Sequence, residues 1–340
     1  PPSSAYATQS PIFHMDKKGL FVGGNFWDGR ATGEKLGNPA ADQAQGPFLN
    51  PMEQALSDSA CVVYRVCNPV IPGDYPISFQ DVWGQGACDI DWPKNVENTC
   101  AKEGRTVNLS SEDRAKSDMA YDSIALSIAA YEASPEVNAF TSKYDQTFKQ
   151  IRKQKVTLTD EEQLGYALFR GKGMCHRCHT SNGQEALFTD YTFDNLGIPQ
   201  NPENPAGVAP EFVDPGLGGF LQSAGYDEAV YMMEWGKHKV PTLRNVDLRP
   251  SDGFVKDYGH NGYFKSLKGI VHFYNTRDVK PMCEELYTES EAMAADCWPV
   301  PEVIETVNKA ELGNLGLTDE EENAIVAFLK ALSDGYVPEE

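Results

Sequence analysis

The segment GKGMCHRCHT, residues 171–180, carries Cys175, Cys178 and His179 in the order Cys-x-x-Cys-His. This spacing is typical of haem c attachment, because one tight turn presents two thiols to the porphyrin vinyl groups and delivers the histidine to the iron. A thioredoxin-type redox pair is disfavoured because no βαβ pattern surrounds the motif. Half of a zinc site is disfavoured because no second cysteine pair has matching spacing. We therefore predict covalent haem c on Cys175 and Cys178, with His179 as an iron ligand.

The elements that must position this motif are helices. Segments 158–169 and 317–332 both begin Leu-Thr-Asp-Glu-Glu, which places a threonine three residues before a glutamate, as in a capping box, ahead of apolar residues at helical spacing. They predict two amphipathic helices that frame the unit holding the motif. A third helix is expected at 116–133, ended by the Ser-Pro step that follows. Between 190 and 260, frequent Pro and Gly predict long ordered loops with short helices.

Six further cysteines form an even set, which is consistent with three disulfides. Their surroundings are loop-like and rich in Pro, Gly and Asp, so buried free thiols are the weaker alternative. An oxidising compartment, the periplasm or the cell surface, follows from this interpretation. Pairing of nearest neighbours along the chain gives the expected bonds: Cys61–Cys67, Cys88–Cys100 and Cys283–Cys297.

Composition limits the classes of partner. The chain has 340 residues, enough for roughly two domains, and its formal net charge of −21 disfavours nucleic acid and anionic lipid surfaces. A basic or neutral protein partner remains compatible with this charge. No apolar run approaches the roughly 18 residues of a membrane span. The start, PPSSAYATQS, has neither an initiator Met nor a signal sequence, so we expect a processed form or a fragment.

Residues 239–278, which begin KVPTLRN and continue through YGHNGYF, resemble the C-terminal haem domain of the di-haem cytochrome c peroxidase and MauG superfamily. The resemblance implies that Arg244 and His260 contact the haem and that the distal iron ligand lies fourteen residues after His260, at Tyr274. Tyrosine there is the pattern of the MauG branch, whereas the peroxidases carry Met. A phenolate ligand would lower the haem potential. Taken alone, Tyr274 reads equally well as a packed aromatic residue, and Met or His stays open as the ligand.

The resemblance extends to the first part of the chain through FWDGRA at 26–31 and QAQGPFLNPMEQ at 43–54. It implies that Trp27 lies between two haems and that Gln43 and Glu53 reach over a peroxidatic haem. A carboxyl group there suits peroxide cleavage, which needs a proton moved between the two oxygens. Without the resemblance, Glu53 would read as a solvated carboxylate and Trp27 as a core residue.

One departure from the family is large, since no first Cys-x-x-Cys-His precedes FWDGR. Either a segment or separate chain carrying the peroxidatic haem is missing from this sequence, which we favour, or that haem has been lost. The family's Ca²⁺ ion between domains has no matching Asn here. The fold expected is mainly α, with two cytochrome c-like domains at 1–150, including a disulfide-rich insertion at 57–105, and 151–340.

The function expected is that of a haem c peroxidase that reduces hydrogen peroxide with electrons from a redox protein donor or a protein substrate, such as a small cytochrome or copper protein. The resemblance also implies a homodimer. Two rival functions stay open: a mono-haem electron-transfer cytochrome, and plain cytochrome c peroxidase activity without the MauG-like ligand.

Overall fold

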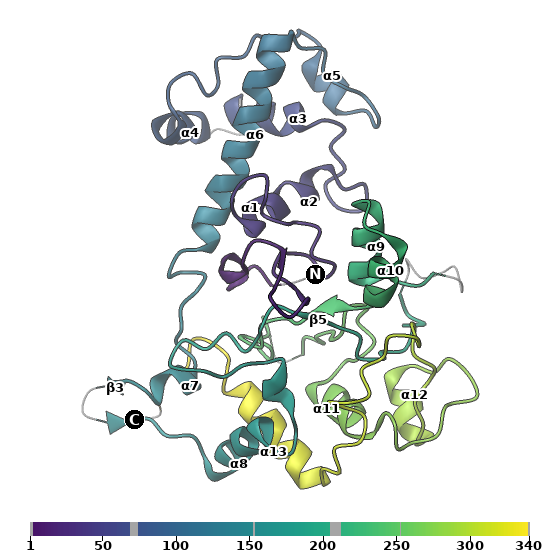
Figure 1. Ribbon diagram of the computed structural model, residues 1–340. Helices are drawn as coiled ribbons and strands as arrows, with labels where there is room; N and C mark the ends of the chain where they lie inside the picture. The colour runs from purple at the N-terminus through teal and green to yellow at the C-terminus, as the bar shows by residue number, and fades with distance from the viewer. Residues whose placement is uncertain (1–2, 69–73, 152–153, 205–211, 252, 339–340) are drawn as a thin grey trace.

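The computed structural model describes residues 3–68, 74–151, 154–204, 212–251 and 253–338, and it is mainly helical (Figure 1). The α-helices are α1 Pro39–Ala44, α2 Gly46–Leu49, α3 Ser59–Cys67, α4 Tyr75–Trp83, α5 Val96–Cys100, α6 Ser111–Glu132, α7 Lys143–Gln146, α8 Asp160–Arg170, α9 Gly216–Ser223, α10 Glu228–Tyr231, α11 Leu267–Thr276, α12 Glu289–Ala294 and α13 Asp319–Lys330. Short 3₁₀ turns are η1 Ala7–Gln9, η2 Cys175–Arg177 and η4 Met232–Glu234. Antiparallel two-residue strands pair as β1 His14–Met15 with β2 Phe21–Val22, β3 Gln150–Ile151 with β4 Gln154–Lys155, and β5 Phe193–Asp194 with β6 His238–Lys239.

The longest helix, α6, confirms the helix predicted at 116–133 but begins five residues earlier, at Ser111. The Ser110 side chain accepts a hydrogen bond from the Asp113 amide and caps this earlier turn. The helix ends at Glu132, just before the Ser-Pro step, as expected. In Figure 1 it runs from the lobe of α3, α4 and α5 toward the part of the molecule that contains α7.

Helices α8 and α13 are the two predicted capping-box helices, and both boxes are present, at Thr159 with Glu162 and at Thr318 with Glu321. They cross closely because Gly165 of α8 has no side chain: a Cβ there would lie 1.9 Å from the carbonyl oxygen of Ala324 in α13. This contact fixes the end of α8, from which the Cys-x-x-Cys-His turn follows directly.

The buried hydrophobic residues form separate clusters. One lies between Tyr144 and Leu332 and is built on α8, α11 and α13. A second lies beneath α3, α4 and α5 against α6. A third joins the N-terminal region to the middle of the chain, with Phe13 and Phe21 packed beside Phe193 and residues of α9. The division into domains at 150/151 stays a prediction.

The disulfides correct two of the three expected pairings. Cys283 bonds to Cys297 as predicted, but Cys61 bonds to Cys100 and Cys67 to Cys88. Cys61 and Cys67 both lie in α3. Six helical residues advance about 9 Å, which is beyond the roughly 7 Å that a disulfide allows between Cα atoms. The pairing of nearest neighbours was therefore wrong because the helix keeps these cysteines apart.

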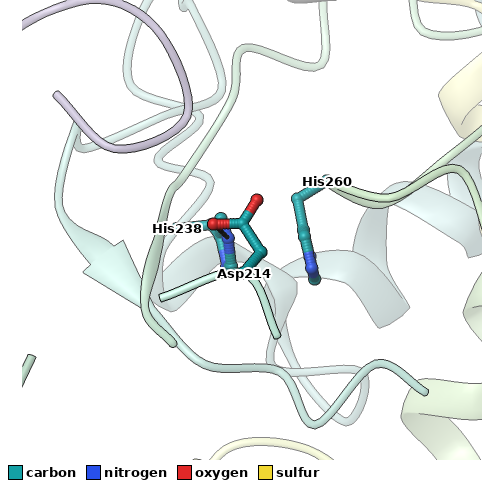
Figure 2. A group of neighbouring side chains, drawn as sticks. All are labelled: Asp214, His238 and His260. Carbon is teal, nitrogen blue, oxygen red and sulfur yellow. Dashed lines mark ion pairs between the residues drawn. The ribbon is translucent and has the colours of Figure 1, made fainter. Parts of the chain in front are cut away.

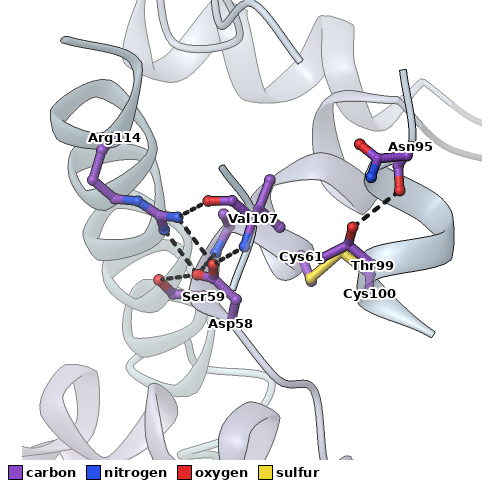
Figure 3. Close-up of a disulfide and its surroundings, with 9 residues drawn as sticks. Asp58, Ser59, Cys61, Asn95, Thr99, Cys100, Val107 and Arg114 are labelled. Carbon is purple, nitrogen blue, oxygen red and sulfur yellow. Dashed lines mark hydrogen bonds and ion pairs between the residues drawn. A yellow bond between two sulfur atoms is a disulfide. The ribbon is translucent and has the colours of Figure 1, made fainter. Parts of the chain in front are cut away.

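A buried carboxylate supports the same lobe. Asp58, the N-cap of α3, accepts from both terminal nitrogens of Arg114 at 2.8 and 2.9 Å and from the Val107 amide at 2.8 Å. Figure 3 shows this network beside the Cys61–Cys100 bond. The network and the disulfide together tie α3 to α5 and α6. In the described part of the chain, no helix combines the length and apolar character needed to cross a membrane.

Candidate functional site

The Cys-x-x-Cys-His segment forms a compact turn at the end of α8. Cys175 opens η2, and the preceding Met174 adopts a left-handed conformation with φ of 55°. The His179 amide closes the turn by donating to the Cys175 carbonyl oxygen at 2.9 Å. Cys175 and Cys178 are the free cysteines of the structure, so both thiols remain available for thioether bonds.

The backbone at Phe188 and at Pro241 holds the imidazole of His179. Its Nδ1 lies 2.8 Å from the carbonyl oxygen of Phe188. A carbonyl oxygen only accepts, so Nδ1 must donate, and the lone pair is left on Nε2. Burial lowers the pKa of His179, which favours the neutral ring. A neutral, oriented imidazole with a free Nε2 is what an iron ligand requires.

The surroundings of the two thiols favour their protonated form. Burial raises the pKa of Cys175 to about 12, and it also raises that of Cys178, where Asp194 and Glu311 add negative charge nearby. A thioredoxin-type redox pair needs a low thiol pKa, so the raised thiol pKa values argue against a redox pair at this motif. The carboxylates of Asp194 and Glu311 lie within 4.8 Å of the Cys178 sulfur and of each other. Sequence reasoning missed both, because neither is near the motif in the chain.

Tyr274 lies in α11 next to the motif. Tyr274 and Cys175 pack against the same hydrophobic cluster. Burial raises the pKa of Tyr274, and the nearby Cys175 and Cys178 contribute in the same direction. Its hydroxyl makes no hydrogen bond to any residue that the structure describes. A half-buried phenol that makes no hydrogen bond to the described residues fits a role as iron ligand, and that role stays a prediction.

Arg244 occupies a fully buried ion pair. Its Nη1 lies 2.6 Å from Asp145 Oδ2, and its Nε donates to the Ala186 carbonyl oxygen at 2.7 Å. Its Nη2 is buried and makes no hydrogen bond within the described part of the chain. One nitrogen is thus free for a further acceptor, such as a haem propionate, and this contact stays a prediction.

The predicted peroxide-binding residues share one cavity. Trp27, Gln43 and Glu53 all line a hollow of about 410 Å³ formed by the first 132 residues. The structure brings the three residues together, and the roles expected for them stay predictions. Further lining residues that sequence reasoning missed include Arg30, whose guanidinium lies 3.9 Å from the centre of the Phe26 ring.

Glu132, at the end of α6, also lines this cavity. One of its carboxylate oxygens is buried without a hydrogen-bond partner among the described residues. Burial raises the pKa of Glu132, against the opposing effect of Ser4. The cavity therefore holds two carboxyl groups, the exposed Glu53 and the desolvated Glu132. No local pattern marks Glu132, because only the tertiary fold brings it beside Gln43.

Trp27 lies where the cavity meets the C-terminal half. The amide of Lys239, in β6, donates to the Trp27 carbonyl oxygen at 2.8 Å. The Lys239 ammonium group donates to Asn25 Oδ1 at 2.8 Å and to the Gly24 carbonyl oxygen. Next to Lys239 in β6, His238 pairs with Asp194 in β5. The residues Trp27, Lys239, His238 and Asp194 therefore connect the cavity wall to the surroundings of Cys178.

The structure places His260 in a separate cluster. Its Nε2 lies 2.8 Å from Glu302 Oε2, and its ring stacks on that of His238. No recorded contact joins it to the Cys-x-x-Cys-His turn among the described residues. The predicted contact between His260 and the haem stays a prediction.

Comparisons with known proteins agree on one family. The family model described as di-haem cytochrome c peroxidase matches residues 3–153. The methylamine utilization protein MauG of Paracoccus denitrificans (strain Pd 1222) is 31% identical, and the match covers 98% of this chain and 73% of MauG. Cytochrome-c peroxidase IdrP1 of Denitromonas iodatirespirans is 26% identical over 91% of this chain and 64% of its own length.

A solved structure supports the same assignment. The di-haem peroxidase BthA of Burkholderia thailandensis E264 superposes with a TM-score of 0.69 at 25% identity, covering 98% of this chain and 71% of BthA. These matches confirm that residues 239–278 and 26–54 resemble the di-haem cytochrome c peroxidase and MauG superfamily, as the sequence indicated. Haem c is the cofactor that this family implies, and the free thiols, the oriented His179 and the unpartnered Tyr274 hydroxyl fit it. The chain belongs to the family of di-haem cytochrome c peroxidases and MauG proteins.

Proposed function

We propose that the protein is a haem c oxidoreductase that reduces hydrogen peroxide with electrons from a protein donor or protein substrate. Family membership supports the class of enzyme. The observation that carries the proposal is the cavity shared by Trp27, Gln43 and Glu53, which lies apart from the Cys-x-x-Cys-His turn. A haem peroxidase needs a polar pocket with a proton carrier, and this cavity offers one.

Bound haem c would supply peroxide binding and electron transfer at its iron. Cys175 and Cys178 would hold one haem covalently, and His179 and Tyr274 would be its iron ligands. The chain contains a single Cys-x-x-Cys-His motif, so a second haem at the cavity would be held by residues outside this sequence. We propose this arrangement over the loss of that haem, because a pocket without iron would leave Gln43 and Glu53 without a task.

Within the cavity, Glu53 would move a proton. Reduction of one peroxide molecule to two waters consumes two electrons and two protons, and the first proton must pass from the near to the far oxygen. A carboxylate within reach performs this transfer as general base and then as general acid. Gln43 would donate its amide N–H to the peroxide and orient it. Trp27 would lie on the electron route, since its carbonyl group is bonded to β6.

The wider setting is part of the same proposal. Three disulfides together with haem c favour an oxidising compartment, the periplasm or the cell surface. The net charge of −21 favours a basic or neutral redox partner. A homodimer and a Ca²⁺ ion between the domains are family expectations that we retain as proposals.

The test compares peroxide turnover of the haem-loaded protein with that of its Glu53→Gln variant. The expected loss is on the order of 10²–10⁴-fold, as for removal of a general acid–base group. Glu103→Gln is the matched control, because Glu103 is exposed and lies outside the cavity. Haem content and absorption should be equal in all three proteins, so that a loss reports proton transfer rather than cofactor loss.

Two results would count against the proposal. Equal turnover in Glu53→Gln and the wild type would remove Glu53 from the chemistry. A haem-loaded protein with one haem and no spectral response to peroxide would instead favour the mono-haem electron carrier. The haem-to-protein ratio and the intact mass of the native protein, measured first, separate these outcomes.

A further inference from the structure

Two buried histidines stack face to face between two carboxylates. The rings of His238 and His260 lie 3.7 Å apart between centroids and 10° from parallel. His238 belongs to β6, His260 to the turn between Tyr258 and Phe264, and Asp214 lies just before α9. Figure 2 shows the three side chains converging from these segments. One ligand atom from each of Asp214, His238 and His260 lies within 4.8 Å of the other two.

One polar atom of the cluster has an ion-pair contact but no well-oriented hydrogen bond. The side chain of His238 is only 10% exposed, and its Nε2 makes no hydrogen bond in the described part of the chain. The nearest acceptor, Asp214 Oδ1, lies 3.4 Å away. Buried ring nitrogens are normally hydrogen-bonded or bound to a metal ion, so this atom requires an explanation. The side chain of His260 is 8% exposed and faces the same space.

The second carboxylate of the cluster, that of Glu302, contacts both His260 and Asp214. Glu302 Oε2 lies 2.8 Å from His260 Nε2, while its Oε1 accepts from the Asp214 amide at 3.0 Å. Asn261 also donates to Glu302, at 3.2 Å. Metal-bound histidines commonly use their other nitrogen to contact such an outer carboxylate. Two lysines flank His238 in the chain. Lys237 is paired with Glu234, and the Lys239 ammonium group donates to Gly24 and Asn25, so neither neutralises the two acidic groups.

We propose that Asp214, His238 and His260 bind one divalent transition-metal ion of the zinc class, with Glu302 orienting His260. Two imidazoles and a carboxylate form a common zinc donor set. Zinc–nitrogen bonds of about 2.0–2.1 Å place tetrahedral ligands about 3.3 Å apart. The lone pair of each nitrogen lies in its ring plane, so one of the two stacked imidazoles must turn out of the stack when the ion binds. Asp214 and His260 also border a cavity of about 60 Å³, which leaves room for a water as fourth ligand.

The ion would join three segments beside the junction described above. His238 precedes Lys239, whose amide binds the Trp27 carbonyl oxygen. A metal ion would therefore stiffen the segment that connects the two halves of the molecule. The assignment is independent of the proposed peroxidase chemistry, and it is an alternative to the predicted contact between His260 and the haem.

The experiment measures zinc on the haem-loaded protein after chelation and equilibrium dialysis against Zn²⁺. One zinc per chain is expected for the wild type and for His14→Gln, a control at an exposed histidine. His238→Gln and Asp214→Asn should lose more than 100-fold in affinity, whereas Glu302→Gln, which changes an outer partner, should lose about 10–100-fold. Zinc should also raise the Tm of the wild type and leave that of His238→Gln unchanged.

A wild type that retains no zinc, or a His238→Gln variant that binds zinc as the wild type does, would overturn the proposal. Zinc at Cys178, Asp194 and Glu311 is the competing location, so loss of binding in Glu311→Gln would also overturn it. Haem content and metal-free Tm of each variant identify misfolding. If His238→Gln fails to fold, the graded comparison of Glu302→Gln with His14→Gln still decides the question.

Discussion

The amide of Lys239 donates to the carbonyl oxygen of Trp27 across the junction between the cavity and the C-terminal half. Burial also changes the pKa of the Lys239 side chain. Burial lowers the pKa of Lys239 to about 7, although Asp28 opposes the shift. Its ammonium group is therefore a titratable component of this junction at physiological pH.

The first prediction concerns pH. Between about pH 7 and the usual lysine pKa of about 10.4, the unfolded chain binds a proton that folded Lys239 does not, so this group makes stability rise with pH. The slope is at most about 1.4 kcal/mol per pH unit. Calorimetry of wild type and Lys239→Met at pH 7.5 and 9.5 should show the Tm difference moving in favour of the wild type. Lys35→Met, at an exposed lysine, should show no such movement.

A second prediction concerns the iron ligand. Tyr274→Phe should change the absorption spectrum of the ferric protein and raise the haem potential, because loss of an anionic oxygen ligand favours the reduced iron. Tyr287→Phe is the control, since Tyr287 packs against the same cluster. Spectroscopy and a redox titration measure both effects. An unchanged Tyr274→Phe spectrum would assign Tyr274 to packing and favour plain cytochrome c peroxidase activity.

The third prediction concerns the buried ion pair. The side chains of Arg244 and Asp145 are completely buried, so Asp145→Asn leaves an unpaired guanidinium and should cost about 3–5 kcal/mol of stability. Glu112→Gln makes the same acid-to-amide change in an exposed pair with Lys116 and should cost less than about 1 kcal/mol. Thermal or denaturant unfolding gives both values. Similar losses in the two variants would contradict the assigned strength of the pair.

A fourth prediction concerns the disulfide lobe. The double variant Cys67→Ser, Cys88→Ser opens a loop of 21 residues and should lower the stability of this lobe by about 2–4 kcal/mol. Haem absorption should stay unchanged, because the lobe has its own hydrophobic cluster apart from α8 and α13. Calorimetry and absorption spectra test the two parts separately. Mass spectrometry of a non-reduced digest should find Cys61 linked to Cys100, and a Cys61–Cys67 link would contradict the structure.

Features that depend on residues close together in the chain could be predicted from the sequence. The capping boxes at Thr159 and Thr318 and the turn at Cys175 depend on residues a few positions apart, so their patterns survive in the sequence. Membership of the family, carried by segments around Trp27 and Tyr274, was likewise predictable. These features need no knowledge of how distant segments pack.

Features made by distant segments were not predictable in this way. The disulfide pairs depend on which cysteines α3 keeps apart, and spacing along the chain does not reveal that separation. Glu132 joins the cavity only because α6 ends beside it. His238 and Asp214 meet His260 only once β6 has paired and the turn after Tyr258 has closed.

The nested disulfides also have a consequence for biogenesis. If the chain is exported, as proposed above, Cys61 and Cys67 emerge in succession, and an oxidase that joins thiols as they appear would first form the bond that α3 forbids. Correct maturation therefore requires thiol–disulfide exchange before the lobe closes. During the same interval Cys175 and Cys178 must stay reduced until haem is attached. The order of oxidation, isomerisation and haem ligation would thus determine how much of the chain becomes active enzyme.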